Sequence, residues 1–409
     1  METDKKRILI CSAVFPPEPV VSAIISQDLA GELSERHSVT VICPAPTRPL
    51  GFVFSEAGAA AEQKKYEKVI VKSYTCPQSK LIGRIYESYS FGKACVAYLR
   101  KHKEDIGLVY LNVWPLCAQY ILAKAARKYK IPVIVHVQDI YPESLLKKIS
   151  NHFLQKIVSK VFIPLDKKIL DFADHVIVIS ENMRKHLRAT RMICDDKMTT
   201  VSNWQDERDF LKCSDAGNTD DKITFMYLGN NGPVARVDWL IKCFCKAKLS
   251  NARLVIAGSG SRRQMCEELA RSLSADNVVF ADVPSGKVPE TQSRADVMVL
   301  SLPPGAARSS IPSKIPAYMF SAKPILGALD LDSDTARAIL ESKGGVVTDP
   351  ADEDAFVEVL QKFANMSKGM LQEMGAASRA YGLAHFARCA NLAVLTKKVE
   401  KLYDENQKI

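Results

Sequence analysis

Short apolar runs alternate with longer amphipathic segments along this 409-residue chain. In the first half many of the runs are continuous stretches of Val and Ile, as in strands buried on both faces of a parallel sheet. Their alternation with helix-like segments predicts a doubly wound α/β domain. The predicted strands are Arg7–Val14, Ser38–Cys43, Lys68–Tyr74, Leu108–Leu111, Pro132–Val137 and His175–Ser180, and the predicted helices are Ala23–Ser34, Ile85–Lys101, Cys117–Tyr129 and Ser180–Arg188.

The second half repeats this rhythm after a polar segment, Gln205–Lys222, which we take as a linker. We therefore predict two Rossmann-like domains, residues 1–204 and 205–385, and a C-terminal helix in residues 386–409. Ligands bind at the carboxyl ends of strands in such sheets, so we expect the two domains to face one another across a cleft. The predicted strands are Ile223–Leu228, Arg253–Ala257, Val278–Phe280, Val297–Leu300, Pro324–Leu326 and Gly345–Val347, and the predicted helices are Trp239–Lys248, Arg262–Leu273, Lys314–Phe320, Thr335–Ser342, Asp352–Asn365 and Asn391–Tyr403.

The composition narrows the class of protein. Hydrophobic residues make up 47% and charged residues 25%, as in an ordinary globular protein. No stretch reaches the ~20 apolar residues of a membrane-spanning helix, and no signal-peptide cleavage region follows the short run Ile8–Phe15. The 11 cysteines lack metal-type spacing and favour reduced thiols in a cytosolic protein. The seven histidines form no HExxH pattern, so we expect no bound zinc. We also expect no cofactor.

The net charge of +10 lies entirely in the first half. Residues 1–200 hold 30 basic and 20 acidic side chains, and residues 201–409 hold 26 of each. Part of the excess lies in the segment Leu145–Lys168. A basic amphipathic helix of this kind binds anionic membrane surfaces, but a surface helix that faces its own core has the same pattern. The apolar positions at i+4 spacing are Ile149, Phe153, Ile157 and Val161, and the lysines around them are Lys147, Lys148, Lys156, Lys160, Lys167 and Lys168.

Two loops of the second half combine flexible backbone with a cation at the start of a helix. The first, Leu228–Arg236, contains Gly229, Asn230 and Asn231 and precedes a helix that begins near Val237. This arrangement suits a phosphate, although ordinary strand-to-helix turns also favour Gly and Asn. The second loop, Ile256–Arg262, carries Gly258, Ser259 and Gly260 and is by itself a weak GxG signal.

A third loop, Ser309–Met319, places a cation where a helix disfavours one. Ser313 is a candidate N-cap for a helix whose first turn contains Lys314 and Pro316. A lysine in the first turn opposes the helix dipole, which indicates a nearby anion; the alternative is a solvated lysine. The candidate anion-binding residues of this loop are Ser309, Ser310, Pro312, Ser313 and Lys314.

A fourth loop, Gln138–Ser144, follows a predicted strand of the first domain and carries two carboxylates, Asp139 and Glu143. Asp139 could act as a base or stabilise positive charge on a reacting sugar. The alternative is a helix N-cap with a structural salt bridge. His136 lies inside an apolar strand and is expected to be a core histidine.

The ordered set of loops resembles the family 4 glycosyltransferases of the GT-B fold, and within them the bacterial subgroup typified by L-fucosamine transferases of O-antigen and capsule synthesis. The similarity extends over nearly the whole chain. The residues that carry it are Phe15–Pro19, Gln138–Ser144, Ser202–Trp204, Leu228–Asn230, Ala257–Gly260, Ile311–Lys314, Tyr318–Met319, Lys323–Pro324, Gly344–Gly345 and His385–Phe386.

The resemblance implies a nucleotide-sugar donor, with Arg236 and Lys314 beside its diphosphate, Gly258 and Gly260 near the nucleotide, and Val283 near the base. Asp139 matches an acidic residue that faces the reacting sugar. Acceptors in the subgroup are polyprenyl-diphosphate-linked sugars at the cytoplasmic face of the membrane. Transfer retains the anomeric configuration and needs no metal, and the final helix packs back on the first domain.

The chain departs from the family pattern in two loops. Ser309 and Ala317 stand where the wider family has two glutamates, the second of which binds the donor ribose. Pro19-Val20-Val21-Ser22 replaces the usual glycine pair of the first loop, and the valines narrow the approach of an acceptor.

We therefore predict a glycosyltransferase that moves a sugar from a UDP-sugar to a lipid-linked or other glycan acceptor, peripheral to the inner membrane face. Asp139, Arg236 and Lys314 are the predicted catalytic residues, and Pro19, Val20, Gln138, Asp139 and Glu143 the predicted acceptor side. The alternatives are a non-catalytic GT-B scaffold of a polysaccharide-assembly complex and a nucleotide-sugar epimerase. A dehydrogenase lacks a complete GxGxxG, and no nucleic-acid-binding module accompanies the basic charge.

Overall fold

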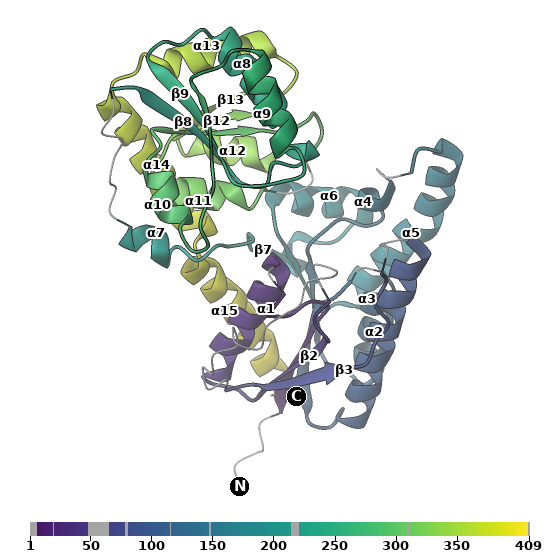
Figure 1. The fold of residues 1–409 in the computed structure, drawn as a ribbon. Helices are drawn as coiled ribbons and strands as arrows, with labels where there is room; N and C mark the ends of the chain where they lie inside the picture. The colour runs from purple at the N-terminus through teal and green to yellow at the C-terminus, as the bar shows by residue number, and fades with distance from the viewer. Residues whose placement is uncertain are drawn as a thin grey trace. The chain divides into compact units, whose positions relative to one another are not determined.

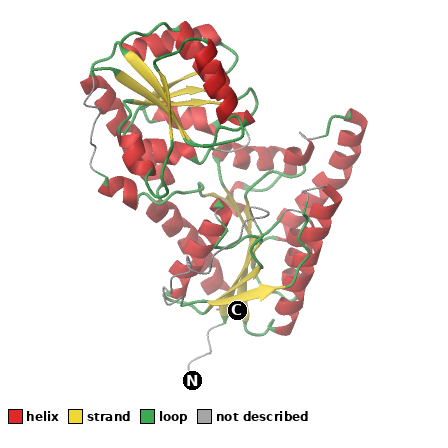
Figure 2. Cartoon of the chain, in the orientation of Figure 1, coloured by secondary structure: helices red, strands yellow, loops and turns green. Residues whose placement is uncertain are grey.

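The computed structural model describes most of the chain and divides it into two compact units. The first comprises Met1–Asn203 with Asn391–Ile409, and the second comprises Trp204–Ala390. The described residues are 6–18, 20–47, 65–77, 81–114, 116–146, 149–213, 221–308 and 311–407. Each unit is a parallel sheet with helices on both faces, as predicted (Figures 1 and 2).

The first unit has a seven-stranded parallel sheet in the order β3-β2-β1-β4-β5-β6-β7. Helices α2, α3 and α5 lie on one face, and α1 lies on the other (Figure 1). The strands are β1 (Arg7–Ser12), β2 (Val39–Pro44), β3 (Glu67–Val71), β4 (Ile106–Asn112), β5 (Val133–Val137), β6 (His175–Val178) and β7 (Met198–Thr200). The helices are α1 (Val21–Ser34), α2 (Leu81–Lys101), α3 (Cys117–Lys128), α4 (Glu143–Leu146), α5 (His152–Phe172) and α6 (Glu181–Arg191).

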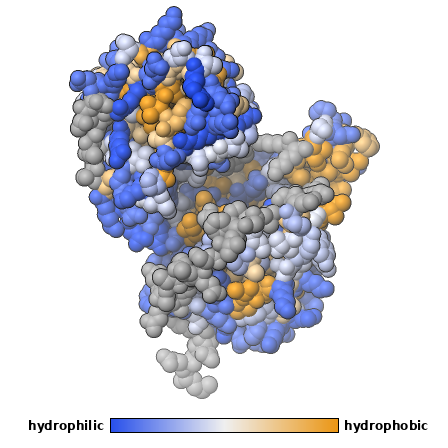
Figure 3. Space-filling view, in the orientation of Figure 1, coloured by the Kyte–Doolittle hydropathy of each residue, from blue (hydrophilic) through white to orange (hydrophobic). Residues whose placement is uncertain are grey.

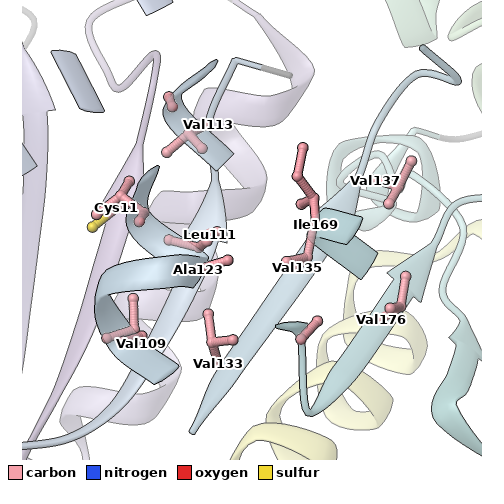
Figure 4. Close-up of a cluster of buried hydrophobic side chains, with 14 of the residues drawn as sticks. Cys11, Val109, Leu111, Val113, Ala123, Val133, Val135, Val137, Ile169 and Val176 are labelled. Atoms are coloured by element: carbon pink, nitrogen blue, oxygen red, sulfur yellow. The ribbon is translucent and has the colours of Figure 1, made fainter. Parts of the chain in front are cut away.

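The continuous Val and Ile runs form the core of this unit, as a two-faced parallel sheet requires. Figure 4 shows side chains of β1, β4, β5 and β6 packed together against Ile169 of α5 and Ala123 of α3. These side chains are wholly or almost wholly buried. The carboxyl ends of the strands therefore have fixed positions, and the loops that follow them project from a rigid sheet.

The second unit has a six-stranded parallel sheet in the order β10-β9-β8-β11-β12-β13. In both units the first strand, β1 or β8, lies inside the sheet, with the next two strands on one side of it and the later strands on the other. The strands are β8 (Ile223–Leu228), β9 (Ala252–Ala257), β10 (Val278–Ala281), β11 (Val297–Ser301), β12 (Ile325–Ala328) and β13 (Gly345–Thr348). The helices are α7 (Arg208–Lys212), α8 (Val237–Lys246), α9 (Arg263–Ser272), α10 (Val288–Ser293), α11 (Lys314–Phe320), α12 (Asp334–Glu341), α13 (Glu353–Ala364) and α14 (Lys368–Phe386).

Helix α14 has no counterpart among the predicted helices. It contains three glycines, which lower helix propensity by about 1 kcal/mol each. The structure shows why glycine is present: a Cβ at Gly375 would lie 2.0 Å from the carbonyl oxygen of Ala322, and one at Gly382 would lie 2.6 Å from the Cβ of Met319. The glycines therefore let α14 pack directly against α11 and the turn after it.

The last helix, α15 (Arg388–Gln407), begins in the second unit and continues in the first. Its first amide, that of Arg388, donates to the carboxylate of Glu207 at 2.7 Å. Within the first unit, Glu400 pairs with Arg36 at 3.0 Å and the Tyr403 hydroxyl donates to the carbonyl of Lys6. Residues from both ends of the chain thus belong to one folded unit.

Candidate functional site

Two glycine loops of the second unit lie directly against each other through their backbones. The first, residues 229–236, follows β8, and the second, residues 258–262, follows β9. Gly258 has a φ of +117°, and a Cβ there would lie 2.4 Å from the carbonyl oxygen of Gly229. Only glycine combines that backbone angle with so close an approach. The two loops therefore form one continuous surface. The predicted donor residues on it are Gly229, Asn230, Asn231, Gly258, Ser259 and Gly260.

Lys314 extends from the start of α11 across this surface. A Cβ at Gly229 would lie 2.6 Å from its Cε and 2.9 Å from its Nζ. The ammonium donates to the hydroxyl of Tyr227 and lies 4.0 Å from the centre of that ring. The Tyr227 hydroxyl in turn donates to the carbonyl of Asn230 at 2.8 Å. The structure therefore brings Lys314 together with the first glycine loop.

In the described part of the chain, the charge of Lys314 has no counter-charge beside it. Burial lowers the pKa of its ammonium to about 8, and among the described residues it pairs with no carboxylate. A half-buried cation is costly unless an anion compensates it. This half-buried cation against the backbone of Gly229 is therefore a candidate anion site.

Tyr318 fixes α11 to the end of β8. Its hydroxyl donates to the carbonyl of Leu228 at 2.9 Å and accepts from the amide of the same residue at 3.0 Å. Ser313 precedes the helix but does not cap it, so the predicted side-chain cap is wrong. With φ −59° and ψ −14° it is already helical, whereas a capping side chain needs an extended backbone.

Asn231 lies wholly buried between the two glycine loops. Its amide donates to the carbonyl of Ser259 at 2.8 Å, and its carbonyl accepts from the amide of Arg262 at 2.9 Å. Neither polar atom of its side chain has a hydrogen-bond partner among the described residues. A buried polar group left unpaired costs about 1–3 kcal/mol. The loops therefore retain hydrogen-bonding capacity for a ligand.

Arg236 is held by backbone carbonyls rather than by an acid. Its Nη1 donates to the carbonyls of Pro350 at 2.7 Å and Leu302 at 3.2 Å, and its guanidinium lies 4.4 Å from the centre of the Trp239 ring. These contacts tie the loop after β8 to the loops after β11 and β13. The guanidinium is thus fixed where several strands of the sheet end.

The other predicted donor residues are less informative. Val283, after β10, and Pro312, before α11, are half-buried. Ser309 and Ser310 lie outside the described residues, as does Pro19 on the predicted acceptor side. Ala317, which stands where the wider family has a glutamate, is a buried residue of α11.

In the first unit, Asp139 is exposed on the loop after β5. The neighbouring Gln138 contacts Nε2 of His136 through its Nε2 at 3.1 Å, and the Tyr110 hydroxyl contacts Nδ1 of the same ring at 2.5 Å. Burial lowers the pKa of His136 to about 3, so this ring is neutral. The prediction of a satisfied core histidine is confirmed, and His136 anchors the start of the loop that carries Asp139.

Glu143, the second carboxylate of that loop, is bonded to basic side chains. Its two oxygens accept from Nη1 and Nη2 of Arg191 at 2.9 and 2.8 Å, and Oε1 lies 2.8 Å from Nε2 of His186. Burial alone would raise its pKa, but the hydrogen bonds from His186 and Arg191 outweigh burial and lower the pKa to about 2. This geometry is that of the structural salt bridge, the alternative that the sequence left open.

The first loop of the unit is held by a residue that sequence reasoning did not single out. The carboxylate of Glu18, only 2% exposed, accepts from the amides of Phe15 at 3.1 Å and Thr47 at 2.9 Å. Val20 is half-buried, with the extended backbone of an N-cap to α1 but no capping side chain. The Pro-Pro-Glu sequence was the available signal for this anchor.

The apolar stripe of the basic segment faces outward. Phe153, Ile157 and Val161 on α5 are 73%, 46% and 58% exposed. The interpretation as a helix that faces its own core is therefore wrong for these positions. Figure 3 shows hydrophobic surface gathered over the end of α5. Lys147 and Lys148 lie outside the described residues, and among those described no helix is long and apolar enough to cross a membrane.

Comparison with known proteins identifies both units. The model of Glycosyltransferase Family 4 matches residues 24–208, and that of Glycosyl transferases group 1 matches residues 222–365. Two parallel-sheet units of this kind, each with a glycosyltransferase family match, define the chain as a glycosyltransferase of the GT-B fold.

Individual relatives agree with this class. A probable glycosyltransferase of Pseudomonas aeruginosa, WbjE, is 21% identical over 347 residues, which cover 80% of this chain and 82% of that protein. The crystal structure of HepE of Anabaena in complex with UDP superposes with a TM-score of 0.68 at 12% identity, covering 97% of this chain and 100% of HepE. WaaG, a glycosyltransferase involved in lipopolysaccharide biosynthesis, superposes with a TM-score of 0.65 at 13% identity, covering 96% and 99% of the chains.

The paired state of Glu143 predicts a pH dependence of stability. Its pKa in the folded chain lies below the usual value of 4.5, so its contribution is present above pH 4.5 and is lost as the pH falls towards 2. Glu143→Gln should lower the free energy of unfolding at pH 7 and flatten its decline between pH 5 and 3, as measured by urea unfolding.

Glu181→Gln is the matched control, since Glu181 accepts only from a hydroxyl, that of Thr200 at 3.3 Å, in the described structure. It should leave the pH profile unchanged. Parallel profiles for Glu143→Gln and the unsubstituted chain would contradict the assignment.

Proposed function

We propose that the chain transfers a sugar from a UDP-sugar to a polyprenyl-diphosphate-linked or other glycan acceptor in surface polysaccharide synthesis. The observation that carries the donor side is the half-buried ammonium of Lys314 against Gly229, without a carboxylate partner among the described residues. A diphosphate supplies the missing negative charge. HepE, a neighbour in fold, was crystallised with UDP, which favours this nucleotide.

Lys314 and Arg236 would stabilise the negative charge that develops on the leaving diphosphate. Such stabilisation by fixed cations is commonly the largest single contribution to catalysis. Both are held by the protein before any ligand binds: Lys314 by Tyr227, and Arg236 by the carbonyls of Leu302 and Pro350. Because these side chains can neutralise the diphosphate, we propose that transfer proceeds without a metal.

Asp139 is the group proposed for the acceptor side. It is exposed on a loop that begins at the carboxyl end of β5, and it would orient the acceptor hydroxyl or balance the charge of an oxocarbenium-like transition state. Because Glu143 is bonded to Arg191, we propose Asp139, the exposed carboxylate of this loop, for that role. We propose retention of the anomeric configuration, in line with the family resemblance and the L-fucosamine-transferase-like subgroup that the sequence motifs favour.

The first unit would rest on the anionic inner face of the cell membrane. Phe153, Ile157 and Val161 present an apolar surface on α5, and Lys156 and Lys160 on the same helix are exposed. Basic residues near an anionic surface contribute on the order of 1 kcal/mol each, and buried CH₂ groups about 0.8 kcal/mol each. This position would give the enzyme access to a lipid-linked acceptor.

A non-catalytic scaffold is the second candidate. Ala317 stands where the wider family has a glutamate that binds the donor ribose. Since Ala317 is buried and has only a methyl side chain, it does not supply that contact. A scaffold would bind UDP-sugars without releasing UDP in the presence of any acceptor.

Loss of the Lys314 ammonium tests the donor site. Lys314→Met should weaken UDP binding by roughly ten- to hundredfold, the value of a hydrogen bond to a charged group. In the unsubstituted chain, UDP affinity should fall as the pH rises through about 8, because the ammonium then loses its proton. Isothermal calorimetry from pH 6.5 to 9.5 measures both effects.

The control is Lys246→Met, which removes an exposed lysine of α8 that pairs with Glu353 and Asp354. Its UDP affinity and pH profile should match those of the unsubstituted chain. Equal UDP affinity for Lys314→Met and Lys246→Met would contradict the donor site.

Loss of the Arg236 guanidinium tests catalysis. Arg236→Ala should lower turnover of UDP-sugar roughly 10²- to 10³-fold, the loss found when one preorganised transition-state contact is removed. Since the guanidinium also bonds two backbone carbonyls, the melting temperature must be measured alongside, and activities compared at a temperature where each chain is folded. Unchanged turnover would contradict the assignment.

Loss of the outward apolar residues tests the membrane surface. Phe153→Ser with Ile157→Ser should lower binding to phosphatidylglycerol vesicles roughly tenfold or more, and raising the salt should weaken binding of the unsubstituted chain. Vesicle sedimentation measures both. The control pair, Met265→Ser on α9 and Leu273→Ser directly after it, removes two exposed apolar side chains from the second unit, which are 42% and 44% exposed. Equal binding of the unsubstituted chain to phosphatidylcholine and phosphatidylglycerol vesicles would show that the basic charge has another role.

A further inference from the structure

Arg191, at the C-terminal end of α6, is wholly buried and makes four hydrogen bonds. Its Nε donates to Asp166 of α5 at 2.7 Å, and its Nη1 and Nη2 donate to the two oxygens of Glu143 of α4 at 2.9 and 2.8 Å. Nη2 also donates to the backbone carbonyl of Tyr141 at 2.8 Å. One side chain thus joins α6, α5, α4 and the loop after β5.

Ion pairs between Arg191 and two carboxylates hold this junction together. Two carboxylates face one guanidinium, with His186 beside Glu143. Burial raises the pKa of Asp166 to about 6 although the bonds from Arg191 lower it, and Glu143 holds its charge more firmly. A buried cation that loses these partners would be left without compensation, so the group holds together as a unit.

The junction lies at one end of the loop that carries Asp139. At the other end, Gln138 contacts His136, which in turn contacts Tyr110 of β4. Asp139 is therefore placed between two anchors, one formed by the sheet and one formed by Arg191. The Arg191 anchor holds backbone as well as side chain, so it determines the direction of the chain immediately after Asp139.

We propose that Arg191 is a positioning residue for sugar transfer, which holds the loop from Gln138 to Glu143 so that Asp139 meets the acceptor in one orientation. The same guanidinium fixes this loop to α5, the helix with the outward apolar residues. The proposal rests on the proposed function. Arg191 itself touches no substrate, because its side chain is fully enclosed.

A lysine substitution of Arg191 distinguishes a positioning role of the side chain from a role that only balances the charge of the two carboxylates. Arg191→Lys keeps a buried positive charge, but one ammonium cannot reach the two oxygens of Glu143, Asp166 and the carbonyl of Tyr141 together. We expect the KM for the acceptor to rise and kcat to fall, each by roughly tenfold, while the Kd for UDP stays unchanged. Hydrogen exchange of the backbone amides of residues 138–141 should also become faster.

Arg184→Lys is the matched control on the same helix, where Arg184 bonds Asp195 through Nε at 3.2 Å and its carbonyl through Nη2 at 3.1 Å. It should leave acceptor KM, kcat and exchange of the loop unchanged. Asp166→Asn is a second variant in case Arg191→Lys folds poorly. Asp166 is buried on α5 and cannot touch an acceptor, yet its loss should raise acceptor KM without changing UDP affinity.

The assay uses the full chain with UDP-hexoses and undecaprenyl-diphosphate-linked N-acetylglucosamine. If the unsubstituted chain binds no UDP and transfers no sugar, the proposed function fails and the positioning role with it. If that chain transfers sugar, but Arg191→Lys and Asp166→Asn change activity only in proportion to their folded fraction, the positioning role alone is overturned. A selective rise in acceptor KM together with faster loop exchange supports it.

Discussion

The half-buried ammonium of Lys314 is the constraint on which the proposed donor site depends. The ammonium can lie against the first loop only because Gly229 has no side chain. The backbone of Gly229 in turn lies so close to residue 258 that residue 258 must also be glycine. Tyr318 fixes the helix that carries the lysine to the end of β8. The outcome is a positive charge held against the backbone of Gly229, with no acid beside it in the described structure.

In the first unit the buried cation is paired with acids. There a buried guanidinium, Arg191, is fully satisfied by Glu143, Asp166 and a carbonyl, and the carboxylate left exposed is Asp139. The excess positive charge of residues 1–200 therefore does not arise from the candidate site itself. Part of it lies on α5, beside apolar residues that the fold leaves outside its core. A neutral second half and a basic first half agree with the proposal of a soluble donor and a membrane-bound acceptor.

Much of the fold could be predicted from the sequence because strands buried on both faces leave continuous runs of Val and Ile. Twelve of the thirteen strands in the described structure overlap a predicted one, and only the three-residue β7 was missed. Helix α14 was missed because its glycines oppose helix formation locally and are explained only by close packing against α11. The periodicity of α5 could not show whether its apolar stripe faced the core, because both arrangements have the same pattern.

The candidate site was predictable where backbone chemistry is visible in the sequence, as in the glycine loops and the lysine that opposes a helix dipole. The site was not predictable where the role of a residue depends on its burial by segments that are distant in the sequence. Nothing near Arg191 in the sequence marks it as enclosed, and nothing near Glu18 shows which amides it binds. The same limit applies to Arg236, whose partners Leu302 and Pro350 lie far along the chain.

The most direct test of the proposed donor site is a crystal structure of the full chain with UDP. We expect the diphosphate within hydrogen-bonding distance of Lys314 Nζ, over the backbone of Gly229 and between the loops after β8 and β9. A diphosphate bound elsewhere, with the Lys314 ammonium still bonded only to Tyr227, would contradict it.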